Sequence, residues 1–264
     1  MERTLQVAKK DTSFMYRLRL RRLKHAFFTG LGLILIAFAG FSGYTLANSS
    51  FFDLEEIRVE GNAAISRDEI VALSGLRMGD NLLKVSGGRV AESISVQPYI
   101  KEIGVKRVFP GRVEIRVGER TPMALVGADG QYLVLDESGY CLTEAALVAA
   151  ESWTLPCIRC SSEGVALEPG RQTQDKGILA ALALIKKLDP FFLENILEFD
   201  APSAEKLAVI NIDGLPVYFG PPEDLDRKLQ NYEELLIKNR EKCNASTLNY
   251  VDIRYDTQIT LSWK

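Results

Sequence analysis

Histidine is nearly absent from this chain of 264 residues. The single copy, His25, lies at the end of a basic N-terminal segment. Everything that follows it therefore lacks the imidazole on which Ser-His-Asp catalysis, Cys-His catalysis and His-based metal sites depend. Gly-rich phosphate loops of the P-loop and dinucleotide-binding types are missing too. We therefore expect no catalytic residue of these kinds, no metal site and no cofactor.

Cysteine is also scarce, and its four copies all lie in the second half of the chain: Cys141, Cys157, Cys160 and Cys243. Cys157 and Cys160 have the CxxC spacing of a redox motif or of half a zinc site. Their segment has the pattern of a strand, however, in which residues three apart are separated by roughly 10 Å, beyond the limit of about 7 Å between Cα atoms for a disulfide. We predict instead either a bridge between Cys141 and Cys157 or simple burial of these thiols.

Beyond residue 25 the chain is acidic, with 24 basic and 33 acidic residues. This balance argues against nucleic acid, which needs a basic surface. Carboxylates are plentiful enough to leave a two-carboxylate glycosidase open on composition, but no pair stands out. Asp136 and Glu137 lie in a turn cluster and are predicted to be solvated. We predict a protein that is not an enzyme and has no small-molecule substrate.

One long apolar run, residues 26–47 (AFFTGLGLILIAFAGFSGYTLA), contains no charged side chain. As a helix it would extend about 33 Å, slightly more than the roughly 30 Å of a bilayer's hydrocarbon core. A cleaved signal peptide is the alternative, but its apolar core is usually about 7 to 15 residues long, and the only candidate cleavage site has the β-branched Thr45 at its first position. The run therefore predicts a retained anchor that contacts the lipid bilayer.

The flanks of this run predict its orientation. Residues 1–25 contain eight basic and two acidic residues, a net charge of +6, whereas the rest of the chain has a net charge of −9. Basic residues next to a transmembrane helix stay in the cytoplasm. We therefore expect residues 1–25 to be a cytoplasmic tail and the main body to lie outside the cytoplasm.

Residues 54–119 carry the pattern β-α-α-β-β. Ser66 and Glu69 form a capping box that opens the first helix. The sequence Phe109-Pro-Gly-Arg112 predicts a type II turn between the last two strands. After it, Val113, Ile115 and Val117 alternate with polar residues, as in a half-buried antiparallel strand.

Residues 122–264 read mainly as antiparallel strands with two helices, which gives an α+β chain. An Asp213-Gly214 pair predicts a hairpin, and Ile259, Leu261 and Trp263 alternate with polar residues in a terminal strand. The expected helices begin near Thr173 and Glu223. The other expected strands lie at residues 123–126, 131–135, 140–142, 155–159, 196–199, 207–212 and 215–219.

Several of these pieces together resemble one family. The run FDLEEIRVEGN, two helices and then VKRVFPGRVEIRVGERTPMAL (Val105 to Leu125), placed after an anchor, resemble the POTRA domain of the FtsQ/DivIB family of bacterial cell-division proteins. The run Tyr250-Val-Asp-Ile-Arg-Tyr-Asp256 resembles the end of that family's β-domain. The similarity implies four parts: a tail (1–25), a transmembrane signal anchor (26–47), a POTRA domain (48–121) and an FtsQ-type β-domain (122–264).

The resemblance also implies a function. Members of this family act as non-enzymatic divisome scaffolds at the septum of the inner membrane, and their last strand and its neighbourhood bind FtsB/DivIC-like partners together with FtsL-like ones. A strand at a sheet edge can be extended by a partner's strand. The matching positions here are Arg254, Tyr255, Thr257, Ile259 and Trp263. Arg254 could pair with a carboxylate, and the aromatic residues could supply buried area.

Simpler roles for these residues remain open at this point. Trp263 could be a core residue that caps the sheet, and Arg254 an ordinary surface charge. Two other functions also remain: a POTRA-type secretion or assembly chaperone, and a membrane-tethered cell-wall enzyme.

Overall fold

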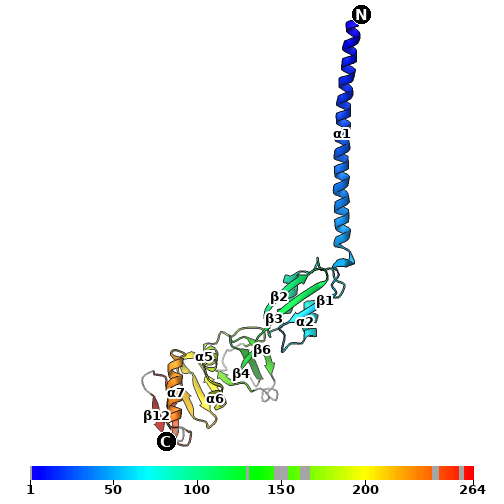
Figure 1. Cartoon of the computed structure of the whole chain (residues 1–264). Helices are drawn as coiled ribbons and strands as arrows, with labels where there is room; N and C mark the ends of the chain where they lie inside the picture. The colour runs from blue at the N-terminus through cyan, green and yellow to red at the C-terminus, as the bar shows by residue number, and fades with distance from the viewer. Residues whose placement is uncertain (1, 129–130, 146–153, 161–166, 240–243, 256–258) are drawn as a thin grey trace. The chain divides into compact units, whose positions relative to one another are not determined.

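The structure is a computed structural model of the whole chain (Figure 1), and it describes all residues except 1, 129–130, 146–153, 161–166, 240–243 and 256–258. The chain forms two compact units. The first comprises residues 1–58, 76–87 and 106–114, and the second comprises residues 59–75, 88–105 and 115–264.

The first unit begins with the long helix α1 (Glu2–Ala47). Its segment Lys24–Ala47 is the one helical stretch in the described part of the chain that is long and apolar enough to cross a membrane. The helix ends at Ala47, as the sequence predicts, and the 3-10 helix η1 (Ser50–Phe52) follows. Among the described residues, the chain thus has one N-terminal helix that is suited to a membrane anchor.

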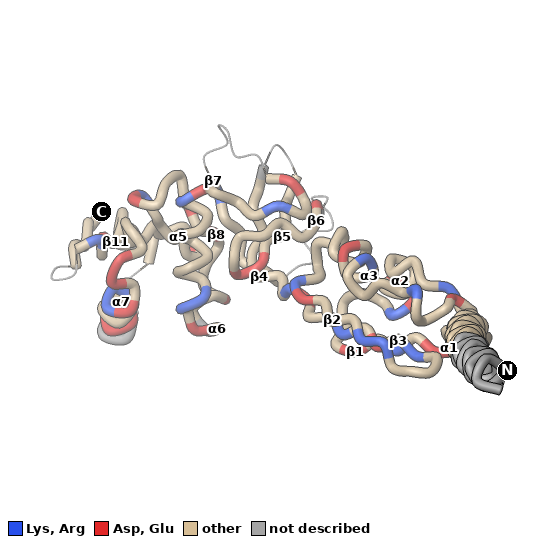
Figure 2. Tube along the Cα trace, turned by 90° about the horizontal axis from the view of Figure 1, so that it is seen from above, with Lys and Arg blue, Asp and Glu red and all other residues tan. Residues whose placement is uncertain are grey.

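A three-stranded sheet has the order β1-β3-β2, with β1 at Glu56–Glu60, β2 at Ile100–Val108 and β3 at Arg112–Glu119. Between β1 and β2 lie α2 (Arg67–Ser74) and α3 (Gly87–Ile94). These elements follow the predicted β-α-α-β-β order. Basic and acidic residues are interspersed along the strands (Figure 2), and Arg112 Nε bonds Glu56 Oε2 across β3 and β1 at 2.7 Å.

Local signals explain the limits of α2. The backbone N–H of Glu69 donates to Ser66 Oγ at 3.2 Å, so the predicted N-terminal cap is present. The helix ends at Gly75, whose φ of 67° lies in the left-handed region that suits a glycine after a helix.

The turn between β2 and β3 differs from the prediction. A type II turn needs a positive φ at its third residue, but Gly111 is not one of the positive-φ glycines, and the Phe109–Pro110 bond is cis. Gly111 is needed for close approach instead, because a Cβ there would lie 2.7 Å from the carbonyl oxygen of Asp53. Its own carbonyl accepts from the backbone N–H groups of Glu55 and Glu56, at 2.7 and 3.2 Å.

A nine-stranded sheet makes up most of the second unit, in the order β12-β11-β10-β9-β8-β7-β4-β5-β6. The pairs β10–β11, β4–β7 and β7–β8 are parallel, and the remaining pairs are antiparallel. Its strands are β4 (Pro122–Ala128), β5 (Gln131–Asp136), β6 (Cys141–Ala145), β7 (Cys157–Cys160), β8 (Ile196–Ala201), β9 (Ala208–Asn211), β10 (Pro216–Tyr218), β11 (Leu248–Asp252) and β12 (Thr260–Trp263).

Helices connect two of the parallel pairs. The chain passes from β7 through α5 (Lys176–Ile185) and α6 (Pro190–Leu193) to β8, and from β10 through α7 (Leu225–Asn239) to β11. Parallel neighbours require such a crossover, whereas antiparallel neighbours can be joined by a short turn. The predicted Asp213-Gly214 turn is of the second kind, since β9 and β10 form an antiparallel hairpin and Gly214 has a φ of 80°.

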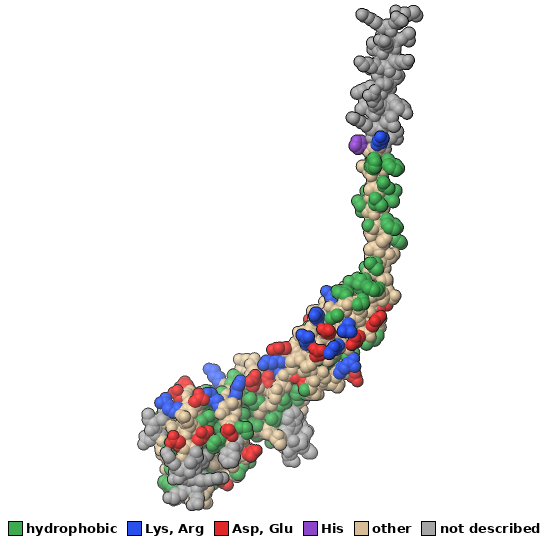
Figure 3. Space-filling model, viewed as in Figure 1, with side chains coloured by type: hydrophobic (Ala, Val, Ile, Leu, Met, Phe, Trp, Pro, Cys, Tyr) green, Lys and Arg blue, Asp and Glu red, His purple; other side chains and the backbone are tan. Residues whose placement is uncertain are grey.

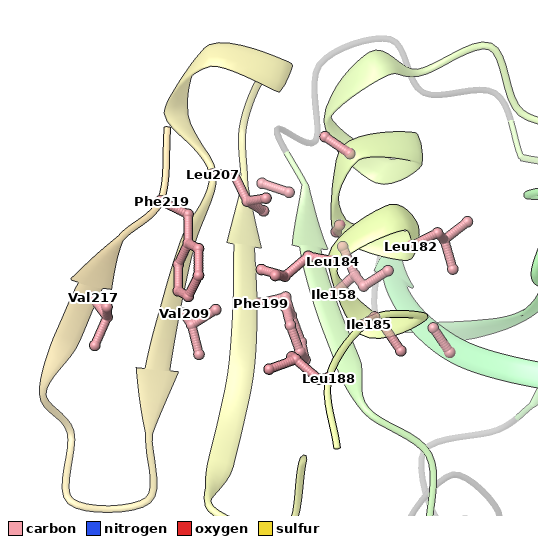
Figure 4. Close-up of a cluster of buried hydrophobic side chains, with 14 of the residues drawn as sticks. Ile158, Leu182, Leu184, Ile185, Leu188, Phe199, Leu207, Val209, Val217 and Phe219 are labelled. Carbon is pink, nitrogen blue, oxygen red and sulfur yellow. The ribbon is translucent and has the colours of Figure 1, made fainter. Parts of the chain in front are cut away.

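The core of this sheet lies against α5. Figure 4 shows Leu184 and Ile185 of the helix close to Ile158 and Phe199 of the strands, and all four belong to one buried cluster. Phe199 and Phe219 are the largest fully buried side chains. The helix begins where Asp175 Oδ1 accepts from the backbone N–H of Ile178 at 2.9 Å. The strand order places β12 and β6 at the two edges of the sheet.

The predicted bridge between Cys141 and Cys157 is wrong. Both residues are free cysteines, as is Cys160, and Cys243 lies outside the described residues. The strands β4 and β5 lie between β7 and β6, and three strand spacings amount to roughly 14 Å, too far for a disulfide. Burial raises the pKa of the Cys141 thiol to about 11, so simple burial is the correct alternative there.

Candidate functional site: the terminal sheet edge

The last strand lies at one edge of the nine-stranded sheet. In the described part of the chain β12 has a single neighbour, the antiparallel β11, which places Val251 opposite Leu261 and Asp252 opposite Thr260. An edge strand presents backbone N–H and C=O groups that another strand can pair with. The sequence predicted the strand but not its place in the sheet.

The alternation along β12 separates two kinds of side chain. Ile259 and Leu261 are partly buried against the core cluster of α5 and the sheet. Trp263, on the same alternation, is 55% exposed. It is therefore not the core cap that one interpretation of the sequence allowed, and its indole is available to a partner at the end of the edge strand.

Arg254 is held by a neighbour in the sequence. Its Nε donates to Asp252 Oδ1 at 3.0 Å and its Nη2 to Oδ2 at 2.6 Å, which makes a two-pronged ion pair. The Asp252 side chain is 11% exposed and that of Arg254 48%. The hydrogen bond from Arg254, opposed by burial, holds the pKa of Asp252 below its usual value. The carboxylate therefore orients a guanidinium that still faces solvent.

Aromatic rings surround this guanidinium. Its carbon lies 6.0 Å from the centre of the Tyr218 ring and 5.8 Å from that of Tyr255, within the range of cation–π contacts. Tyr218 also packs edge-on against Tyr250, with ring centres 5.6 Å apart. Gly220 leaves room for the arginine, since a Cβ there would lie 2.9 Å from Arg254 Cγ. Tyr255 is 68% exposed.

Of the predicted residues, Trp263 lies on β12, opposite Leu248, whereas Arg254 and Tyr255 lie in the connection that follows β11; all three side chains are exposed. Ile259 contributes to the core more than to the surface, and Thr257 lies outside the described residues. Tyr218 and Tyr250 were missed, because the parallel pairing of β10 with β11 that makes them neighbours is a contact between distant segments. The signal that could have marked them is a tyrosine next to the buried Val217 and Val251 in each strand.

The predicted solvated turn at Asp136 is wrong. The Asp136 side chain is only 3% exposed, and its Oδ2 accepts from Arg120 Nη1 at 2.7 Å. Its Oδ1 accepts from the hydroxyl and backbone N–H of Ser138 and from the backbone N–H of Tyr140. Each oxygen thus has a structural partner. Glu137, by contrast, is exposed as expected and pairs with Lys186.

The terminal edge has the features of a surface for an extended peptide. A strand can be added beside β12, exposed aromatic side chains can bury area, and an oriented arginine can bind a carboxylate. Among the described residues no group of three or more His, Cys, Asp or Glu side chains could hold a metal ion.

Two family models match this chain. Residues 52–120 match the family model "POTRA domain, FtsQ-type", and residues 124–254 match "Cell division protein FtsQ/DivIB, C-terminal". Cell division protein FtsQ of Syntrophotalea carbinolica is 31% identical over 233 residues, covering 87% of this chain and 80% of the relative. FtsQ of Geobacter sp. strain M21 is 32% identical, with 86% and 84% covered. DivIB of Clostridium acetobutylicum is 23% identical, with 78% and 80% covered.

Proposed function

The chain belongs to the FtsQ/DivIB family of cell-division proteins, and from this premise we propose that it is a non-enzymatic divisome scaffold. Its β-domain binds FtsB/DivIC-like and FtsL-like membrane partners and so links early and late division proteins at the septum. The tail, residues 1–25, lies in the cytoplasm, residues 26–47 cross the inner membrane, and the POTRA domain (48–121) and β-domain (122–264) lie in the periplasm.

The observation that carries this proposal is the position of β12. It is the last strand of the sheet, it has one neighbour among the described residues, and it ends in an exposed tryptophan, Trp263. A partner segment that pairs with β12 would continue the sheet through backbone hydrogen bonds and would cover the indole. The match to an FtsQ-type POTRA domain favours this role over that of a secretion chaperone.

Arg254 supports a preference for an acidic partner segment. Its side chain is paired with Asp252 on one side and half exposed on the other. A second carboxylate, from the partner, could bind the exposed face of the guanidinium, while Tyr255 and Tyr218 flank it. The edge strand would then supply affinity and the arginine would supply register.

The experiment is co-purification of the full chain with the FtsB-like and FtsL-like proteins from membranes. We expect Trp263→Ala and Tyr255→Ala each to weaken the complex by about 30-fold or more, the loss typical of a buried aromatic anchor worth about 2 kcal/mol. Leu197→Ala is the matched control, because Leu197 is 60% exposed on β8, inside the same sheet.

Two outcomes would contradict the proposal in different ways. If both aromatic variants retain the partners as well as Leu197→Ala does, the site is wrong although the function can stand. If the wild-type chain does not associate with these partners at all, the function itself is wrong.

A further inference from the structure

The end of the membrane helix is fastened to a segment that lies well beyond it in the sequence. Asn81 Nδ2 donates to the carbonyl oxygen of Ala47, the last residue of α1, at 2.8 Å. Lys84 Nζ donates to Asn48 Oδ1 at 3.0 Å. The backbone N–H of Leu82 donates to the carbonyl of Phe52 at 2.7 Å. All of these residues belong to the first unit, so its folded part meets the anchor directly where the helix ends.

A row of three aromatic rings forms at the same place. Phe51 and Phe52 contact each other edge-on, with ring centres 5.1 Å apart. Phe52 makes a second edge-on contact with Phe109, at 6.0 Å. Phe109 comes from the turn between β2 and β3, far along the chain, so only the fold brings it to the end of the anchor.

Two of these three rings are exposed to solvent, and Phe52 between them is partly buried. Phe51 is 62% exposed and Phe109 52%, and the neighbouring Leu83 is 41% exposed. Figure 3 shows hydrophobic side chains gathered where the helix meets the folded part of the first unit. We call Phe51, Phe52, Leu83 and Phe109 the juxtamembrane patch. Exposed apolar groups that cluster in this way mark an interaction surface.

The depth of the patch follows from the length of the helix. The 24 residues of Lys24–Ala47 extend about 36 Å, more than the roughly 30 Å of hydrocarbon. With Lys24 at the cytoplasmic boundary of the hydrocarbon, Ala47 would lie at headgroup level on the other side. Phe51 follows four residues later, and Phe109 is joined to it through the single ring of Phe52. This interfacial zone is where aromatic side chains are most favourable.

We propose that the juxtamembrane patch is a second membrane contact, in which Phe51 and Phe109 insert between the lipid headgroups at the outer surface of the bilayer that α1 crosses. Lys84 lies beside the patch at the end of the helix, where its ammonium group can reach lipid phosphates. The nearby Asp80 carboxylate accepts a hydrogen bond from the backbone N–H of Arg77, so this acidic side chain has a partner within the protein.

This contact would fix the first unit against the membrane surface. A helix alone leaves the unit that follows it able to tilt and turn, whereas a helix plus an inserted turn restrains both movements. The inference depends on the membrane anchor and not on partner binding at β12, so each can fail without the other.

The test is depth-dependent quenching in lipid nanodiscs that hold the full chain and no other protein. The two native tryptophans, Trp153 and Trp263, are replaced by phenylalanine, and Phe109→Trp is the reporter. Phe51→Trp is the positive control, because its distance from the helix is set by the sequence. Leu197→Trp, exposed in the second unit, is the negative control. The quencher is a phosphatidylcholine brominated near the headgroup end of its acyl chains.

We expect quenching of Phe109→Trp to reach at least half that of Phe51→Trp and to exceed that of Leu197→Trp severalfold. Quenching no greater than that of Leu197→Trp would overturn the proposal, whether or not a partner protein later shields the patch. Thermal unfolding checks that the reporter is folded. If Phe109→Trp is not, Leu83→Trp is measured against the same controls and the same outcomes apply.

Discussion

Asp136 combines deep burial with charge, since its side chain is only 3% exposed. Burial by itself would raise the pKa of this carboxyl, but the hydrogen bonds from Ser138, Tyr140 and Arg120 outweigh that effect and hold the pKa below its usual value. The Arg120 side chain is 16% exposed, and its guanidinium carbon lies 3.8 Å from the centre of the Tyr140 ring. The ion pair of Asp136 and Arg120 is thus held by hydrogen bonds to the carboxylate and by the Tyr140 ring beside the guanidinium.

We predict that Asp136→Ala lowers the free energy of unfolding by about 3 kcal/mol, because it leaves a largely buried guanidinium without its counter-ion. Glu137→Ala is the matched control. Its carboxylate pairs with Lys186 and Lys101 in solvent, so its loss should be much smaller. Chemical denaturation of both variants measures the difference, and equal losses would show that the buried network contributes nothing.

Acid should remove the same contribution from the wild-type protein. The folded-state pKa of Asp136 is lowered, so its stabilisation is complete above the unfolded-state pKa of about 3.9 and disappears as the pH falls through the lower folded-state value. The difference in stability between wild type and Asp136→Ala should therefore be constant near neutral pH and shrink below about pH 4. A difference that grew in acid would have the wrong sign.

At the scale of elements, the helices α5 and α3 place a glycine at the same position, the second residue, for different reasons. In α5 a Cβ on Gly177 would lie 2.3 Å from the carbonyl oxygen of Ala201, at the end of β8. In α3 a Cβ on Gly88 would have no atom within 4 Å. The first glycine lets a helix lie directly on a strand, and the second has no such constraint.

We predict opposite effects for the two alanine substitutions. Gly177→Ala should destabilise the protein by about 1–3 kcal/mol, because the backbone on which its new methyl group would press cannot rotate away. Gly88→Ala should stabilise it by about 0.5–1 kcal/mol through the higher helix propensity of alanine. Thermal unfolding of the two variants measures both changes in stability. If Gly88→Ala also loses stability, the space around each glycine does not explain the difference between the two positions.

At the scale of the whole molecule, the charge balance around the anchor should decide which side each part occupies. Residues 1–25 carry a net charge of +6 and the remainder −9. Because positive flanks stay in the cytoplasm, alkaline phosphatase fused after Lys264 should be active, since it folds with its disulfides outside the cytoplasm.

The control for this orientation is the same enzyme fused directly after His25, ahead of the anchor, which should be inactive. Activity in the second fusion and none in the first would reverse the orientation. That result would also place the partner-binding edge on the wrong side for the proposed function.

Sequence patterns alone were sufficient to predict the elements that depend on residues close together in the chain. The apolar run from Ala26 to Ala47 needs only its own length and composition to specify a spanning helix. The cap at Ser66 and the turn at Gly214 depend on residues within a few positions of one another. The alternation at Ile259, Leu261 and Trp263 predicts a strand with one apolar face. These features are short-range, so they can be read in the order of the chain.

Only the tertiary structure decided which segments meet. The sequence does not show that β10 lies parallel to β11, and so it hides the tyrosine pair beside Arg254. It does not show that two strands separate Cys141 from Cys157, that Asp136 is buried against Arg120, or that Phe109 reaches the end of the anchor. Each of these depends on contacts between distant residues, which form only when the whole core packs, and no local pattern encodes them.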